Sequence, residues 1–166
     1  MRNGESHVLI IPLFSSIKMF QLIKTPIEDL NLRKSFSSPE AGGFCVFEGW
    51  VRNHNEGKIV VGLEYEAMEK LCTSEARKIF NEVKGKFEIL KAVCYHRVGN
   101  LEVGEMAVWV GVSAKHREYA FKACRYIIDE VKIRLPIWKK EYYEDGTSEW
   151  VNCQCQDHLK KEKVYL

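Results

Sequence analysis

The spacing of apolar positions along the chain predicts two helices. Between residues 68 and 87 apolar side chains recur at helical spacing, which favours a helix with one buried face; its apolar positions are Met68, Leu71, Cys72, Ala76, Ile79, Phe80 and Val83. A second helix is expected to begin near Ser113, a suitable N-cap. Pro136 lacks an N–H and restricts the residue before it, so this helix is expected to end near Leu135. Its apolar positions are Ala120, Phe121, Cys124, Ile127, Ile128, Val131 and Leu135.

The other ordered segments have the composition of strands. GFCVFEGWVR (43–52) is rich in aromatic and β-branched residues, and IVVGLEYEA (59–67) follows after a short turn, so the two are expected to form a hairpin. ILKAVCYHRVG (89–99) and EMAVWVGV (105–112) are expected to be two further strands, and residues 137–151 a final hairpin around Asp145-Gly146. Two helices against a largely antiparallel sheet indicate an α+β domain.

Length and composition fit one globular domain. The chain has 166 residues, of which 46% are apolar, a length that allows a substantial core. We expect a single domain over residues 19–152 and a polar tail over 153–166, and we interpret residues 1–18 as an extension, a misassigned start or an extra edge strand. The net charge of +2 comes without a long basic stretch, so nucleic acid is not an expected partner.

Membrane and metal sites are not expected either. HVLIIPLF (7–14) is far shorter than the roughly 20 residues of a membrane span, and no convincing cleavage site follows it. The six cysteines include one close pair, Cys153 and Cys155, without a second ligand pair, so no metal is predicted. Four cysteines fall inside apolar patterns, where a free thiol behaves as a small hydrophobe. These features predict a reduced, cytoplasmic protein.

The segment VKIRLPIWKKE (131–141) gathers four cations around a proline: Lys132, Arg134, Lys139 and Lys140. Because the helix breaks at Pro136, the amines of Lys132 and Lys139 could converge on one pocket. A lysine in a partly apolar pocket near other cations has its pKa lowered, and it can then act as a nucleophile or general base. The alternative is a cation-rich helix end that complements the helix dipole, followed by a solvated strand.

Other cations stand at predicted element ends. His116 and Arg117 fall at the start of the second helix, where free amides and an arginine together bind phosphate well. Arg52 lies near a hairpin tip, where simple turn chemistry is an equal alternative. His96 and Arg97 are interpreted as structural. The residues alone therefore predict a cationic pocket for an anionic, phosphorylated small molecule.

Four fragments together resemble one family. FEGWVRNHN, YHRVGNLEVGE, VGVSAKHREYAF and KIRLPIWKKE, in this order, are similar to the large, catalytic subunit of molybdopterin synthase, and the resemblance covers residues 19 to 152. It implies an α/β-hammerhead-type fold and a homodimer within a heterotetramer, with a small ubiquitin-like subunit at each outer end. The implied reaction adds two sulfurs to cyclic pyranopterin monophosphate to form the dithiolene of molybdopterin. The sulfur would arrive as a thiocarboxylate on the C-terminal Gly-Gly of the small subunit, and no cofactor is implied.

The resemblance also implies roles for individual residues. Lys132 and Lys139 match the catalytic lysines of the family, and the matches to its substrate-binding residues are Arg52, His116, Arg117 and Arg134. A family cation expected near Gln154 is absent here, which leaves phosphate binding at that point without its usual partner. The alternative function is a non-catalytic phosphate- or nucleotide-binding module that scaffolds a ubiquitin-like partner. An orphan paralogue without a partner is a third possibility.

Overall fold

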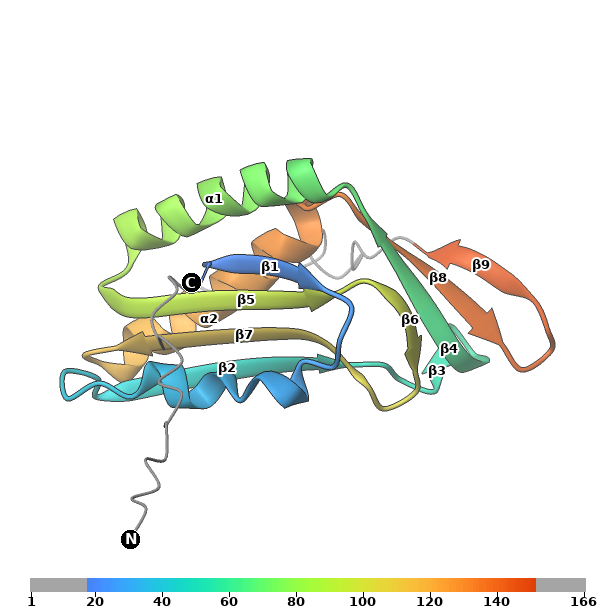
Figure 1. Cartoon of the computed structure of the whole chain (residues 1–166), viewed down its shortest axis with the longest axis horizontal. Helices are drawn as coiled ribbons and strands as arrows, with labels where there is room; N and C mark the ends of the chain where they lie inside the picture. Colours follow the sequence, from blue (N-terminus) through green and yellow to red (C-terminus); the bar gives the residue numbers. More distant parts are fainter. Residues whose placement is uncertain (1–17, 152–166) are drawn as a thin grey trace, which may run out of the picture.

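The structure is a computed structural model that describes residues 18–151. The interpretations of residues 1–17, of the tail 153–166 and of Gln154 fall outside the described residues. Along the chain (Figure 1) the elements are β1 (Phe20–Ile23), η1 (Glu28–Leu30), η2 (Leu32–Phe36), β2 (Gly43–Trp50), β3 (His54–Asn55), β4 (Lys58–Ala67), α1 (Glu69–Lys86), β5 (Ile89–Arg97), β6 (Gly99–Glu102), β7 (Met106–Ala114), α2 (Arg117–Arg134), β8 (Ile137–Tyr143) and β9 (Ser148–Val151).

A four-stranded sheet forms the centre of the domain. Its strand order is β1-β5-β7-β2, in which β1 pairs parallel with β5 and the other pairs are antiparallel. Both helices cover one face of this sheet, and the segment with η1 and η2 lies on the other face (Figure 1). All nine residues of β7 are buried, because this central strand is covered on both faces. The predicted α+β class is confirmed.

The two helices contribute the largest apolar cluster. The buried residues of α1 are Cys72, Ala76, Ile79, Phe80 and Val83, and those of α2 are Ala120, Ala123, Cys124, Ile127, Ile128 and Val131. Helical spacing correctly predicted most of these positions. Met68, Leu71 and Phe121 are the exceptions, since each is more than half exposed.

A second sheet stands at one end of the first. β4 pairs with β8 along one edge and with β3 and β6 along the other, and β9 extends the sheet beyond β8. The β8–β9 hairpin turns at Gly146, whose φ of 82° suits glycine, as the Asp-Gly pair predicted. Within residues 18–151 no helix combines the length and apolarity that a membrane crossing needs.

Two sequence predictions were wrong. Segments 43–52 and 59–67 do not form one hairpin, because β2 pairs with β7 over its whole length and β4 belongs to the other sheet. The hairpin that does form here is short: the two residues of β3 pair with the start of β4, around a turn with positive φ at Glu56 and Gly57. Ser113 is not the N-cap of α2: it is 1% exposed inside β7, paired on both sides, and the helix starts at Arg117 with His116 as its N-cap.

Candidate active site

Lys132 lies in the last turn of α2 beside a surface pocket of about 350 Å³. The helix ends at Arg134 because Pro136 cannot continue it, and the chain turns at once into β8. Lys132 itself is exposed. The pocket is lined by β2 and α2 residues: Cys45, Val46, Phe47, Phe121, Cys124, Arg125, Ile128, Asp129 and Lys132. An amine at the edge of a largely apolar pocket can bind a carboxylate or thiocarboxylate that enters it.

Lys139 is the third residue of β8 and is tied to a buried carboxylate. Its Nζ lies 2.6 Å from Oε1 of Glu141, which is two residues further along the strand and 4% exposed at its side chain. Asn55 and Tyr143 donate hydrogen bonds to Oε2 of the same carboxylate. Burial acts to raise the pKa of Glu141, but the donors, Lys139 foremost, outweigh it and lower that pKa. Glu141 therefore fixes the position of the Lys139 amine.

Tyr65 and His96 are in ring contact near the two lysines. Lys139 stands directly opposite Tyr65 on β4, so the two side chains share one face of the second sheet. The Tyr65 ring meets the His96 ring edge-on at 4.9 Å between centroids, and the charge of Lys132 acts on His96. Lys139 does not line the pocket beside Lys132, so the predicted convergence of the two amines on one pocket is not found there.

His96 is held neutral at the end of β5. It is 8% exposed, and its Nδ1 lies 2.7 Å from the carbonyl oxygen of Arg97, so Nδ1–H donates to that oxygen. Burial lowers the pKa of His96 to about 4; the hydrogen bond to Arg97 opposes this shift, and the positive charge of Lys132 adds to it.

The free energy of unfolding is expected to fall when the protein is acidified from pH 6.5 to pH 4. In this window the unfolded chain protonates His96 and the folded protein does not, so acid favours unfolding, by up to roughly 3 kcal/mol for this one group. His96→Gln should remove much of this pH dependence, measured by urea unfolding at pH 7 and pH 5. The matched control is His54→Gln at the exposed hairpin tip, which should keep the wild-type change in the free energy of unfolding between the two pH values. An equal change in all three proteins would contradict the assignment.

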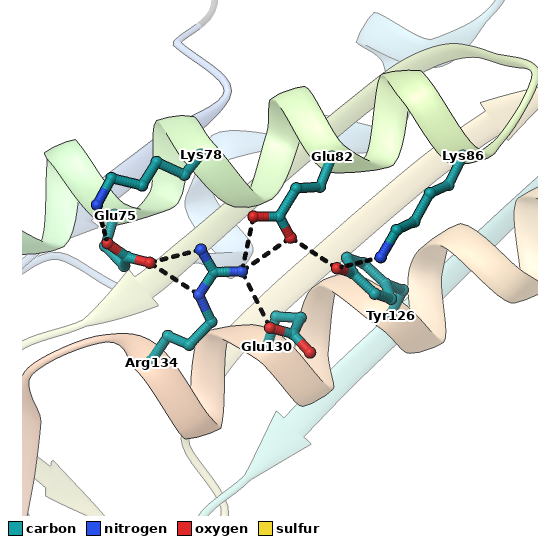
Figure 2. A network of polar contacts seen from close by, with 7 residues as sticks. All are labelled: Glu75, Lys78, Glu82, Lys86, Tyr126, Glu130 and Arg134. Carbon is teal, nitrogen blue, oxygen red and sulfur yellow. Dashed lines mark hydrogen bonds and ion pairs between the residues drawn. The ribbon is translucent and has the colours of Figure 1, made fainter.

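Arg134 lies in a network of charges between the helices (Figure 2). Its guanidinium contacts Glu75 and Glu82 of α1 and Glu130 of α2, at distances of 2.5, 2.8 and 3.1 Å. Hydrogen bonds from Arg134 and Tyr126 lower the pKa of Glu82 to about 2. Three carboxylates engage this one cation, so we assign Arg134 to the packing of α1 on α2 and leave it out of the proposed substrate site.

Arg134→Gln is expected to lower the melting temperature by several degrees at neutral pH and low salt, because three carboxylates then lose their shared cation and only Glu75 keeps another, Lys78. The lowered pKa values of Glu75 and Glu82 mean that the contribution is present above pH 4.5 and is lost as the pH falls toward 2. The loss on substitution should therefore shrink in acid, as thermal unfolding at pH 7 and pH 2.5 would show. Lys122→Gln, which breaks the exposed pair with Glu118, is the control and should have little effect at either pH.

The three remaining predicted cations do not meet within one chain. Arg52 follows the carboxyl end of β2, whereas His116 and Arg117 stand at the other end, where Gly43 begins this strand. A Cβ built on Gly43 would come within 3.0 Å of the Cα of Arg117. All three side chains are exposed. Eight strand residues separate the two groups by roughly 25 Å, more than two arginine side chains can bridge.

Sequence reasoning did not predict Glu141 or Tyr65 in this region. The spacing of Glu141 from Lys139 puts both side chains on one face of a strand and could have identified the pair. His96 was interpreted as structural, and its burial agrees with that interpretation. Among residues 18–151 no group of three or more His, Cys, Asp or Glu side chains could hold a metal ion.

Known proteins resemble this chain in sequence. The MoaE protein family matches residues 22–134. A molybdopterin synthase catalytic subunit from Synechococcus elongatus is 43% identical over 125 residues, which are 74% of this chain and 76% of that protein. Its counterpart from Pyrococcus abyssi is 45% identical over 128 residues, or 75% and 86% of the two chains.

Solved structures share the fold of this chain. Molybdopterin synthase from Staphylococcus aureus superposes with a TM-score of 0.75 at 33% identity, covering 81% of this chain and 98% of that one. A complex of subunits 1 and 2 of molybdopterin-converting factor from Helicobacter pylori shares the fold with a TM-score of 0.66 at 20% identity, covering 83% and 92%. The resemblance predicted from the four fragments is confirmed, and the chain belongs to the MoaE protein family, the family of the molybdopterin synthase catalytic subunits.

Proposed function

We propose that this chain converts cyclic pyranopterin monophosphate to molybdopterin with sulfur from a small ubiquitin-like subunit. The observation that carries the proposal is Lys132, which lines a largely apolar pocket in a chain of this family. The C-terminal Gly-Gly of the small subunit would enter this pocket and bring its thiocarboxylate to the Lys132 amine. Two thiocarboxylates are consumed for each dithiolene, because each carries one sulfur.

The two lysines are assigned different work. Lys132 acts as general acid and base and contacts the incoming thiocarboxylate, since its amine is exposed at the pocket. Lys139, with its amine fixed by Glu141, keeps a positive charge where negative charge develops on the substrate. The ring contact between His96 and Tyr65, which stands opposite Lys139, is proposed to shield the two amines from each other.

The phosphate is proposed to bind between two copies of the chain. Arg52 of one copy follows the carboxyl end of β2, whereas His116 and Arg117 lie at the start of this strand. A homodimer that places the start of α2 of one copy against Arg52 of the other would bring all three cations to one phosphate. The small subunits would then bind at the outer ends and complete a heterotetramer. The Helicobacter pylori relative of this fold, solved as a two-subunit complex, is consistent with such an assembly.

The direct test is reconstitution. The full chain is mixed with a thiocarboxylated small subunit and cyclic pyranopterin monophosphate, and molybdopterin is detected as its fluorescent oxidation product. Product is expected with the thiocarboxylate form and not with the carboxylate form of the small subunit. Absence of product with a competent small subunit would overturn the proposed function.

A further inference from the structure

Two cysteines from different elements line the Lys132 pocket. Cys45 comes from β2 and Cys124 from α2, and both are free cysteines. Cys45 packs against the apolar cluster to which Cys124 belongs, and it lies close enough to add to the raised pKa that burial gives the Cys124 thiol. Cys124 also directs its Sγ at the carbonyl oxygen of Val110, at 3.8 Å. The pair therefore joins the helix to the sheet at one side of the pocket.

The two thiols differ in access. Cys45 is partly exposed, whereas Cys124 is 3% exposed and lies behind it. Two further buried cysteines of the described chain, Cys72 and Cys94, do not line this pocket. An accessible thiol backed by a second, shielded thiol is the arrangement in which the first reacts with an oxidant and the second resolves the product.

We propose that Cys45 and Cys124 form a reversible disulfide that changes the wall of the Lys132 pocket when the protein is oxidised. The oxidant is a small disulfide such as oxidised glutathione. The Cys45 thiolate attacks one of its sulfurs, which gives a mixed disulfide and releases one glutathione thiolate. The Cys124 thiolate then attacks the Cys45 sulfur and expels the second glutathione. Two protein thiols are oxidised to one disulfide, and oxidised glutathione is reduced to two thiols.

The burial of Cys124 sets the expected rate. Burial raises the pKa of its thiol, and the neighbouring Cys45 adds to this effect, so little thiolate exists at neutral pH. Disulfide closure should therefore be slow at pH 7 and accelerate by about tenfold for each pH unit in the alkaline range, in proportion to the thiolate fraction. A pH-independent rate would contradict a resolving step by this buried thiol.

Disulfide mapping tests the chemistry without a partner or substrate. The full chain, with Cys153→Ser and Cys155→Ser, is incubated with oxidised glutathione at pH 8.5, alkylated, digested and analysed by mass spectrometry. A peptide that joins Cys45 to Cys124 is expected. Cys45→Ser and Cys124→Ala should each abolish it, whereas Cys72→Ala should leave it intact. Alkylation of both thiols, or glutathione retained on Cys45 alone, would overturn the proposal.

The effect on the pocket rests on the proposed function and has its own readout. In the wild type, the oxidised protein should form molybdopterin at least about tenfold more slowly than the reduced protein, and dithiothreitol should restore the rate. In Cys45→Ser the ratio of the two rates should stay near one. An unchanged ratio despite a mapped disulfide would overturn the effect on the pocket. If the reduced protein forms no product, the proposed function fails, while the mapping still decides whether the disulfide forms.

Discussion

Lys132→Arg is expected to lower molybdopterin formation at least a hundredfold, the loss that a general acid–base residue of about 10²–10⁴-fold effect would cause. Arginine keeps the positive charge, but it does not release its proton at cellular pH. The side chain is exposed at the pocket edge, so the larger guanidinium has room and the fold should be unaffected. The measurement is single-turnover product formation with a thiocarboxylated small subunit, with the melting temperature as a check on folding.

Lys140→Arg is the matched control for this substitution. Lys140 belongs to the same cationic segment, but it neighbours Lys139 in β8 and so projects from the opposite face of the sheet. Its amine lies over the rings of Tyr142 and Trp150, at 5.4 and 5.9 Å from their centroids. Activity should change less than about threefold, since charge and ring contacts are both kept. If Lys132→Arg were equally active, Lys132 would act through its positive charge alone and not as a general acid and base.

The helices could be predicted from the sequence because their burial is periodic. The α1 helix packs one side on the sheet, so Cys72, Ile79 and Val83 repeat at helical spacing and are fully buried. The start of α2 could not be predicted in the same way. Ser113 has the chemistry of an N-cap, but pairing of β7 with strands on both sides extends the strand past it. Tertiary pairing decided a boundary that local propensity could not.

Strand partners were harder to predict than strands. Segments 43–52 and 59–67 are adjacent in sequence and both extended, which favours a hairpin, yet each finds its main partner more than forty residues away. The chain turns out of the first sheet after Trp50, where the β2–β7 register shifts, and Val51 donates its N–H to the carbonyl oxygen of Glu105. This break sends β4 into the second sheet and brings Tyr65 opposite Lys139.

The four cations of segment 131–141 lie in different environments in the structure. Alternation along β8 sends Lys139 and Lys140 to opposite faces, and the helix places Lys132 at a pocket and Arg134 between two helices. Sequence spacing predicted the gathering of charge, but not that three glutamates would engage Arg134. Those partners lie on α1 as well as on α2, so only the packing of the two helices brings them together.

Mixing two inactive variants is expected to restore activity if the phosphate site spans two chains. Arg52→Ala and Arg117→Ala should each reduce kcat/KM by about 10- to 100-fold as homodimers, because each removes a charged hydrogen bond to the phosphate. In a mixed dimer, one of the two sites receives both mutated residues and the other receives neither. Random pairing makes about half of the dimers mixed, so about a quarter of wild-type activity should return.

The control for this experiment is a mixture of two variants whose mutated residues belong to the same chain's site. The helix starts beside Gly43 and runs along the first sheet away from that end of β2 (Figure 1), so the proposal puts Lys132, in its last turn, in one site with Arg52 of the same chain. Arg52→Ala mixed with Lys132→Ala should therefore restore nothing, because every site would keep one defect from its own chain. Recovery in the first mixture and not in the second would require that Arg52 and Arg117 serve one site from different chains. Equal residual activity in both mixtures would instead mean that each chain binds the phosphate with its own residues.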